Sequence, residues 1–206
     1  MRLGLMGGTF DPVHNGHLQV ARAAAPYGLD RVALVPARRP PHKDRDDMAD
    51  PYHRFAMAAL AAAGDDRICV SSHEVARDGP SYTIDTVRHF AGRGHDVTLI
   101  LGSDSLAELE TWRECRALLD LARLLVYPRR PYLGDPLESR LPGWIRDRRS
   151  AGAILWLDGE PVETSSTQVR ALLRAGGSAQ ALVPQPVERY ILKHRLYTGG
   201  LEGATE

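Results

Sequence analysis

Six short runs rich in Val, Ile and Leu alternate with longer segments of helical spacing along most of the chain. The apolar runs are typical of strands buried on both faces, and they lie at residues 2–6, 31–35, 67–71, 96–101, 122–127 and 153–157. The helical segments cover roughly residues 15–25, 51–63, 82–92, 104–120, 165–175 and 185–195. Because parallel strands need crossover connections that are usually helices, the alternation predicts an α/β fold: a Rossmann-like, doubly wound, mostly parallel sheet with helices on both faces.

The length of the chain and the absence of a low-complexity linker favour a single domain. A chain of 206 residues, 43% of them hydrophobic, can bury a continuous core. We therefore expect one domain over residues 1–206, with a helical C-terminal part at about 164–197 and a frayed tail at 198–206. Residues 128–150 carry six arginines against three acidic residues, and we expect an irregular, solvated connection there.

Charge and cysteine content restrict the partners and the compartment. The 26 basic and 26 acidic residues cancel, so the whole chain has no bulk attraction for nucleic acid or for an acidic membrane surface. Cys69 and Cys115 fall far short of a disulfide framework, and no run approaches the roughly 18 apolar residues of a membrane span. We expect a cytoplasmic protein that binds neither nucleic acid nor membrane. The sequence does not fix the oligomeric state, and a homo-oligomer is one of the states it allows.

The loop after the first apolar run has the composition of an anion site. The sequence GGTFDPVHNGHL begins at Gly7 and ends at Leu18. Its glycines allow a ligand to approach the backbone closely, and a helix that begins near Asn15 would direct its free N–H groups and the positive end of its dipole at the same space. His14 and His17 flank the first turn of that helix, and each can donate a ring N–H to a phosphate, more strongly when protonated.

Two other interpretations of this loop are weaker. A metal site would need a third ligand, and the sequence has no nearby carboxylate or cysteine at helical spacing. The histidines could also merely cap and pack the turn. The presence of two histidines close to Gly7, Gly8 and Thr9 favours ligand binding instead. Neither the P-loop pattern nor the GxGxxG pattern of dehydrogenases is present.

A second candidate anion element lies about 150 residues further along the chain. The sequence TSSTQVR, residues 164–170, follows an apolar run and precedes an apolar helix, and Thr164, Ser165 and Ser166 are all candidate N-caps. Arg170 lies four residues after Ser166 and three after Thr167, so a helix would place hydroxyls and a guanidinium on one face at its positive end. The arrangement suits a triphosphate chain, although an ordinary capped helix with a surface arginine fits equally well.

The two elements together resemble the signatures of the HxGH nucleotidyltransferase superfamily. GGTFDPVHNGH resembles its HxGH loop and SSTQVR its SSTxxR motif. The resemblance implies that His14, His17 and Arg170 are catalytic and that ATP is bound by Gly7, Gly8, Thr9, Phe10, His14, His17, Asp104, Ser166, Thr167 and Arg170. It also implies Mg²⁺ as a cofactor, held mainly by the substrate phosphates rather than by protein ligands.

Three further stretches narrow the resemblance to the nicotinate-nucleotide adenylyltransferases. They are PPHK at 40–43, SYTIDTV at 81–87 and LGSDSLAELETW at 101–112, and with VERYILKHRLY at 187–197 the resemblance spans most of the chain. The resemblance implies transfer of AMP from ATP to nicotinate mononucleotide, which forms deamido-NAD and pyrophosphate in NAD biosynthesis. It further implies that Lys43, Thr83 and Trp112 bind the acceptor, with Trp112 stacked on the cationic pyridinium ring and N–H groups near Thr83 and after Trp112 on the nicotinate carboxylate.

Several alternatives stay open at the level of sequence. Trp112 could instead pack in the core, since Leu106, Leu109 and Trp112 recur every three residues, and Lys43 could be a solvated cation. Arg129 and Arg130 follow a strand and could line the site, but no motif requires it. The acceptor could be nicotinamide mononucleotide or phosphopantetheine, and a non-catalytic nucleotide-binding regulator would carry the same phosphate site.

Overall fold

The computed structural model describes residues 1–40, 47–129, 137, 141–159 and 161–198, and these ranges contain one six-stranded sheet. The strands are β1 (Arg2–Gly8), β2 (Arg31–Pro36), β3 (Ile68–Val70), β4 (Asp96–Gly102), β5 (Arg123–Tyr127) and β6 (Ile154–Trp156). Their order is β3-β2-β1-β4-β5-β6, and all neighbouring strands are parallel. The predicted doubly wound parallel sheet is therefore confirmed.

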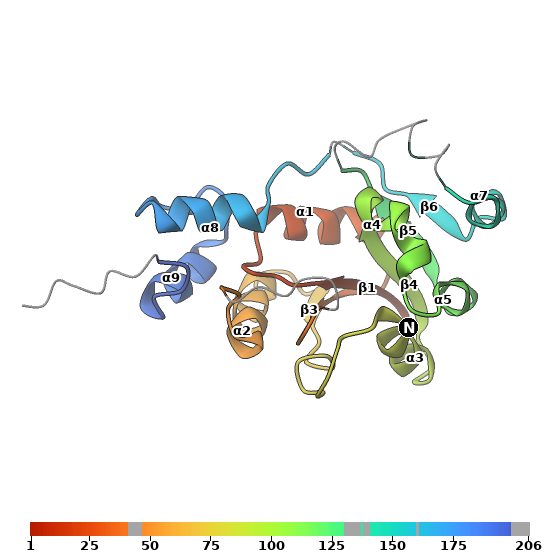
Figure 1. The fold of residues 1–206 in the computed structure, drawn as a ribbon, viewed down its shortest axis with the longest axis horizontal. Helices are drawn as coiled ribbons and strands as arrows, with labels where there is room; N and C mark the ends of the chain where they lie inside the picture. The colour runs from red at the N-terminus through yellow and green to blue at the C-terminus, as the bar shows by residue number, and fades with distance from the viewer. Residues whose placement is uncertain (41–46, 130–136, 138–140, 160, 199–206) are drawn as a thin grey trace, which may run out of the picture.

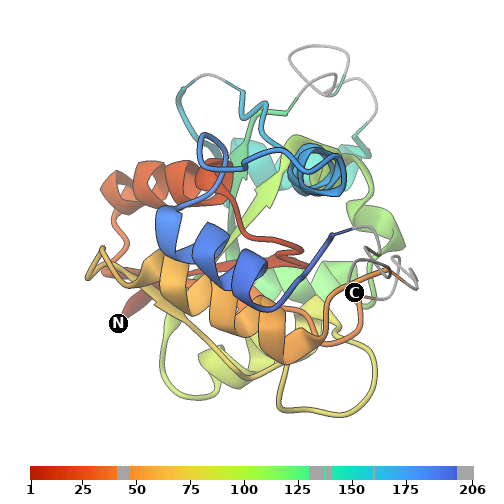
Figure 2. The same ribbon diagram turned by 90° about the vertical axis from the view of Figure 1, so that its left-hand side faces the viewer.

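Helices cover both faces of this sheet (Figure 1). One layer contains α1 (Asn15–Ala24), the 3₁₀ helix η1 (Ala25–Tyr27), α2 (Pro51–Ala62), α8 (Ser166–Arg174) and α9 (Gln185–Lys193). The other contains α3 (Thr83–Ala91), α4 (Ser103–Ala107), the 3₁₀ helix η2 (Leu109–Thr111), α5 (Cys115–Leu121) and α7 (Gly143–Ser150). Helix α9 (blue) lies along α2 (orange) in Figures 1 and 2, so the last helix of the chain packs against one of the first.

The strand side chains alternate between two hydrophobic cores, as the period-two geometry of a strand requires. In β1, Leu3 and Leu5 are buried on the side of α3 and α5, whereas Met6 is buried on the side of α1 and α2. Leu5 is paired with Ala33 of β2 on one edge and with Leu99 of β4 on the other. The middle of β1, from Leu3 to Met6, is thus enclosed on all sides, and Arg2 at one end and Gly7 at the other are exposed.

Two segments differ from the sequence prediction. The predicted helix over 104–120 is broken into α4, η2 and α5, because Trp112 is extended and Glu114 is left-handed at φ 51°. The prediction of an irregular connection over 128–150 is wrong for α7, which begins after Pro142 and buries Ile145 against the core. Its only large apolar side chains, Trp144 and Ile145, are adjacent in sequence, which gives no helical period that could reveal it. Arg130 and most of residues 131–140 lie outside the described residues.

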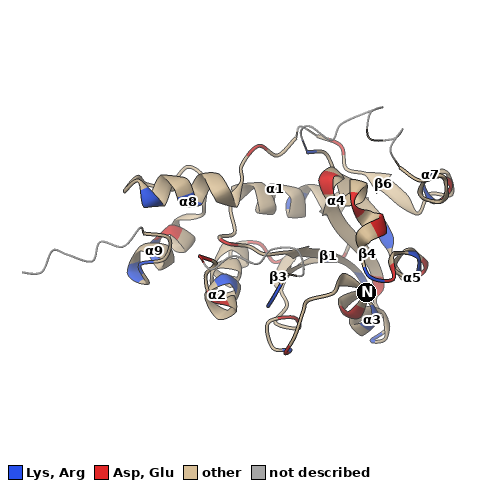
Figure 3. Cartoon of the chain, viewed as in Figure 1, with Lys and Arg blue, Asp and Glu red and all other residues tan. Residues whose placement is uncertain are grey.

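The strand order marks where a ligand would bind. In sequence order, β2 and β3 are added on one side of β1, and β4, β5 and β6 on the other side, so the strand order reverses at β1 and β4. Ligands of doubly wound sheets bind in the crevice at such a reversal. Acidic and basic residues are interspersed over the helices in the view of Figure 3, in keeping with a net charge of zero. None of the described helices is long and apolar enough to cross a membrane.

Candidate active site

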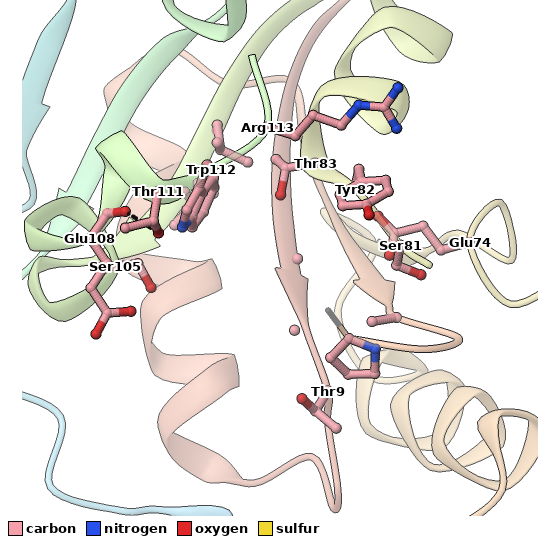
Figure 4. Close-up of a pocket in the computed structure, with 16 residues that line it drawn as sticks. Thr9, Glu74, Ser81, Tyr82, Thr83, Ser105, Glu108, Thr111, Trp112 and Arg113 are labelled. Carbon is pink, nitrogen blue, oxygen red and sulfur yellow. Dashed lines mark hydrogen bonds between the residues drawn. The ribbon is translucent and has the colours of Figure 1, made fainter. Parts of the chain in front are cut away.

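A pocket of about 430 Å³ opens at the carboxyl ends of β1 and β4 (Figure 4). Gly7, Gly8 and Thr9 line one part of it, and Thr83 and Trp112 line another. The first three residues of the candidate anion loop and two of the three predicted acceptor residues therefore share one cavity, at the reversal point of the sheet, whereas His14 and His17 are not among the residues that line it. The third, Lys43, lies outside the described residues.

The glycines of the first loop leave room for a ligand. A Cβ added at Gly7 would meet nothing within 4 Å, whereas one at Gly8 would lie 3.2 Å from the ring of Phe10. Phe10 itself is buried and its ring stands edge-on to that of His17, with centroids 4.8 Å apart. Gly7 is thus the position where a ligand can approach the backbone, and Phe10 supports the histidine from behind.

The ring of His17 is held in one orientation and one tautomer. The backbone N–H of His14 donates to His17 Nδ1 at 3.1 Å. Because a backbone N–H is always a donor, Nδ1 is the acceptor and neutral His17 carries its proton on Nε2. The ring is also stacked on that of His14, with centroids 3.7 Å apart. His17 is therefore prepared to donate one N–H to an anion from Nε2.

Two backbone N–H groups at the start of α1 are already engaged. The N–H of Asn15 donates to the carbonyl of Leu182 at 2.8 Å, and that of His17 donates to the carbonyl of His14 at 2.9 Å. The prediction that the first N–H groups of this helix face a ligand is therefore wrong for these two. The helix dipole still favours an anion at this end.

His14 is neutral near pH 7. It is almost fully buried, and burial, followed by the positive charge of Arg129, lowers its pKa to about 4. Within the described part of the chain its Nδ1 is buried without a hydrogen-bond partner. The stronger donation expected of a protonated histidine therefore does not apply to His14 near pH 7, whereas a neutral imidazole can still donate one N–H.

The burial of His14 predicts a loss of stability on acidification. Unfolded His14 titrates near pH 6.5, so between pH 6.5 and 4 the unfolded chain takes up a proton that the folded chain excludes. The contribution of neutral His14 to the free energy of unfolding is fully present above pH 6.5. It is lost as the pH falls to 4, which lowers the free energy of unfolding by at most about 3 kcal/mol. Urea unfolding of the wild type and of His14→Gln over this range should show a shallower pH dependence in the variant. Identical pH profiles would contradict this assignment.

Asp11 ties the first loop to the end of the chain. Its Oδ1 accepts a hydrogen bond from the hydroxyl of Tyr197 at 2.6 Å and one from the N–H of Ala49 at 3.1 Å. Burial, and then the charge of Asp11, raise the pKa of Tyr197, so this hydroxyl stays a donor. The loop between β1 and α1 is therefore fixed by a residue 186 positions away.

Arg54 fixes the same loop from α2. Its guanidinium donates to four backbone carbonyls: those of Ala49 at 2.9 Å, Thr9 at 2.7 Å, Ala37 at 2.6 Å and Arg38 at 3.0 Å. The side chain is 1% exposed. A guanidinium has five N–H donors in a rigid fork, so Arg54 joins the phosphate-facing turn after β1 to the end of β2.

The second candidate element lies directly against the first. Ser165 caps α8 in a capping box with Gln168, and Ser166 donates its hydroxyl hydrogen to the carbonyl of Pro12 at 2.9 Å. Arg170 donates to the carbonyl of Asp11 at 2.6 Å and to the hydroxyl of Thr167 at 3.3 Å. The two elements predicted from sequence are thus adjacent, and the buried Arg170 lies in the joint between them.

Asp104 and Arg129 form a pair at the ends of β4 and β5. Arg129 Nη1 lies 3.0 Å from Asp104 Oδ2, while Asp104 Oδ1 is buried and has no hydrogen-bond partner among the described residues. An oxygen of this kind fits a ligand hydroxyl or a hydrated cation. Among residues 1–40, 47–129 and the later described segments, no three His, Cys, Asp or Glu side chains are grouped to hold a metal ion.

The acceptor end of the pocket lies between α3 and η2. Thr83 is the first residue of α3, where the N–H groups have no intrahelical acceptor. Trp112 both packs against the core and lines the pocket, so the two sequence interpretations of this residue coexist. Glu74 lines the pocket wall behind, where it accepts a hydrogen bond from Thr86 at 2.5 Å, and burial raises the pKa of its carboxyl.

Sequence patterns missed the residues that support this site. Asp11, Arg54, Glu74 and Tyr197 make their contacts through single side chains over long sequence separations, which no local spacing reveals. Of these residues only Asp11 lies inside a segment with a recognisable motif, the loop GGTFDPVHNGHL. Charged residues are rarely fully buried unless paired, so a hydropathy pattern assigns Arg54 to the surface.

Comparisons with known proteins agree with this geometry. The cytidylyltransferase-like family model matches residues 5–172. A probable nicotinate-nucleotide adenylyltransferase of Marinomonas sp. (strain MWYL1) is 39% identical over 209 residues, which cover 95% of this chain and 94% of the relative. A protein of the same name from Pseudomonas aeruginosa (strain UCBPP-PA14) is 38% identical over 213 residues, which cover 95% and 97%.

A solved structure shows the same fold at low sequence identity. Plasmodium falciparum nicotinic acid mononucleotide adenylyltransferase complexed with NaAD superposes with a TM-score of 0.73 at 17% identity, over 98% of this chain and 99% of that one. The family match, the two relatives and the fold agree with the motifs at both ends of the pocket. The chain belongs to the cytidylyltransferase-like family and, within it, to the nicotinate-nucleotide adenylyltransferases.

Proposed function

We propose that the chain transfers the adenylyl group of ATP to nicotinate mononucleotide, forming deamido-NAD and pyrophosphate. The observation that carries this proposal is the continuity of the pocket, which runs from Gly7 and Thr9 to Thr83 and Trp112. A mononucleotide whose ring stacks on Trp112 would direct its phosphate toward the histidine loop. The names of the curated relatives support the same reaction.

The reaction needs positioning and charge stabilisation rather than a general base. A phosphate monoester has a second pKa of about 6, so the acceptor phosphate is already nucleophilic near neutrality. One of its oxygens forms a bond to the α-phosphorus of ATP, and the bond from that phosphorus to the oxygen bridging to the β-phosphate breaks. The work of the chain is to align two anions and to stabilise the charge that develops on the α-phosphate and on the departing pyrophosphate.

The histidine loop, the start of α8 and Asp104 each have a distinct part in this proposal. His17 donates Nε2–H to the reacting phosphate, since its Nδ1 is occupied by the N–H of His14. Ser166 and Thr167 place the start of α8 at the phosphates of ATP. Arg170 holds this start against the histidine loop by donating a hydrogen bond to the carbonyl of Asp11. Asp104 contributes its unpartnered oxygen to the nucleotide.

Mg²⁺, held mainly by the phosphate oxygens of ATP, would neutralise part of their charge. The donor set fits this arrangement, because the described residues offer the single oxygen of Asp104 rather than a cluster of protein ligands.

Pyrophosphate release with a panel of acceptors tests the function. The protein is mixed with ATP and Mg²⁺ and, in separate reactions, with nicotinate mononucleotide, nicotinamide mononucleotide or phosphopantetheine. We expect the highest kcat/KM with nicotinate mononucleotide, because the curated relatives that match almost the whole chain are named for that acceptor. Reactions without acceptor give the background of ATP hydrolysis. Faster release with another acceptor would identify that acceptor as the substrate, and no release with any of them would indicate a nucleotide-binding regulator.

A further inference from the structure

Arg113 is the one cation among the described residues that line the pocket. It follows Trp112 directly, and its guanidinium carbon lies 4.8 Å from the ring centroid of Tyr82, the residue before α3. In Figure 4 its side chain extends along the rim from the Trp112 side toward Tyr82, past Thr83. The positive charge is therefore held over Tyr82, which lines the same pocket as Thr83 and Trp112.

The acidic neighbour of Arg113 competes only weakly for its charge. Glu114 Oε1 lies 3.8 Å from Arg113 Nε, a long contact. The same carboxylate is bound at both oxygens by Arg88, at 3.1 Å and 2.6 Å. A carboxylate that is already bound by two guanidinium nitrogens attracts a second cation less strongly. The stacked position over Tyr82 also restricts the side chain without using its N–H groups.

The other charged groups of the pocket do not cancel Arg113 at this end. Glu108 also lines the pocket, but in Figure 4 its side chain points away from Arg113 and Tyr82. The buried carboxyl of Glu74 accepts the hydroxyl hydrogen of Thr86. The region beside Trp112 and Thr83 is accordingly biased toward an anionic group.

We propose that Arg113 is a specificity-determining residue, which favours a pyridine mononucleotide with a ring carboxylate over the corresponding amide. This inference rests on the proposed function. The backbone N–H groups at Thr83 can serve an amide oxygen as well as a carboxylate, since either accepts a hydrogen bond. The guanidinium distinguishes the two ligands because only the carboxylate carries a charge. Its side chain is 53% exposed, so solvent screening limits the effect to that of one partly hydrated charge-assisted hydrogen bond.

The test compares Arg113→Gln with Arg113→Lys and with a matched arginine elsewhere. Arg116 is the control, because its guanidinium carbon lies 4.8 Å over the ring of Trp144, outside the pocket. We expect Arg113→Gln to lower the ratio of kcat/KM for nicotinate mononucleotide to that for nicotinamide mononucleotide about tenfold. The loss should fall on the acid alone. Arg113→Lys should retain most of the ratio, and Arg116→Gln all of it.

Binding without ATP separates this inference from the proposed function. Calorimetric titration of each variant with the two mononucleotides should give the same tenfold change in the ratio of Kd values, whether or not the protein turns over. In the wild type, higher salt should reduce the preference for the acid, because an exposed charge is screened. The inference is overturned if Arg113→Gln weakens both mononucleotides equally, or if its ratio equals that of Arg116→Gln.

Discussion

His17→Ala is expected to lower kcat by about two to three orders of magnitude while KM for ATP and for nicotinate mononucleotide changes little. The size is that of a single preorganised hydrogen-bond donor to a developing charge. His17 is prepared for this role before substrate arrives: its Nδ1 accepts the N–H of His14 at 3.1 Å, and the rings of Phe10 and His14 restrict it. The donor therefore acts in the transition state without reorganisation, and its loss should appear in kcat rather than in KM.

A second variant separates the lost donor from a disturbed loop. In His17→Asn the side-chain oxygen can still accept the N–H of His14, but nothing replaces Nε2–H. We expect His17→Asn to be nearly as slow as His17→Ala. His89, in the last turn of α3 and not among the residues that line the pocket, is the control, and its replacement by alanine should leave kcat unchanged. Steady-state pyrophosphate release measures all three variants. Turnover within threefold of wild type in His17→Asn would refute the electrostatic role.

The fold was predictable because its strands are buried on both faces. Runs such as LGLM and VALV have no polar residue at alternate positions, which few structures other than an enclosed parallel strand require. The strand order was not predictable in the same way. It depends on which edge of β1 each crossover returns to, and no residue within a run records that choice.

The candidate site was predictable only where its residues adjoin one another in sequence. His14 and His17 share one loop, whose spacing favours an anion site, and Ser166, Thr167 and Arg170 share one helical turn, whose spacing fits an anion site and an ordinary capped helix equally well. That the two places meet is fixed by contacts such as Ser166 to Pro12, across 154 positions. Arg113 illustrates the same limit. Its position over Tyr82 depends on the break between η2 and α5, whereas the helical spacing over 104–120 predicted one continuous helix.

The largest effect on stability is expected at Arg54. Arg54→Met keeps the apolar stem but removes all donors to the carbonyls of Ala49, Thr9, Ala37 and Arg38. Breaking a buried charged network on one side costs about 3–5 kcal/mol, because the groups left behind stay buried without partners. We expect a loss of this size in the free energy of unfolding, measured by urea denaturation. Arg67→Met is the matched control, since its side chain is 59% exposed and its loss should cost less than about 0.5 kcal/mol.

Arg54→Lys shows whether the fork or the charge holds the loop. Lysine supplies three donors from a single nitrogen and cannot reach carbonyls that arise from three separate segments, at residues 9, 37–38 and 49. Its stability should therefore lie between those of the wild type and Arg54→Met. Because the carbonyl of Thr9 belongs to the turn that lines the pocket, kcat should fall in the same order, even at temperatures where every variant is folded. If Arg54→Lys matched the wild type in both measurements, a single charge would suffice to hold the loop. If Arg54→Met unfolded like Arg67→Met, the four carbonyls would have found other donors, and the rigidity of the histidine loop would have to come from Asp11 and Tyr197.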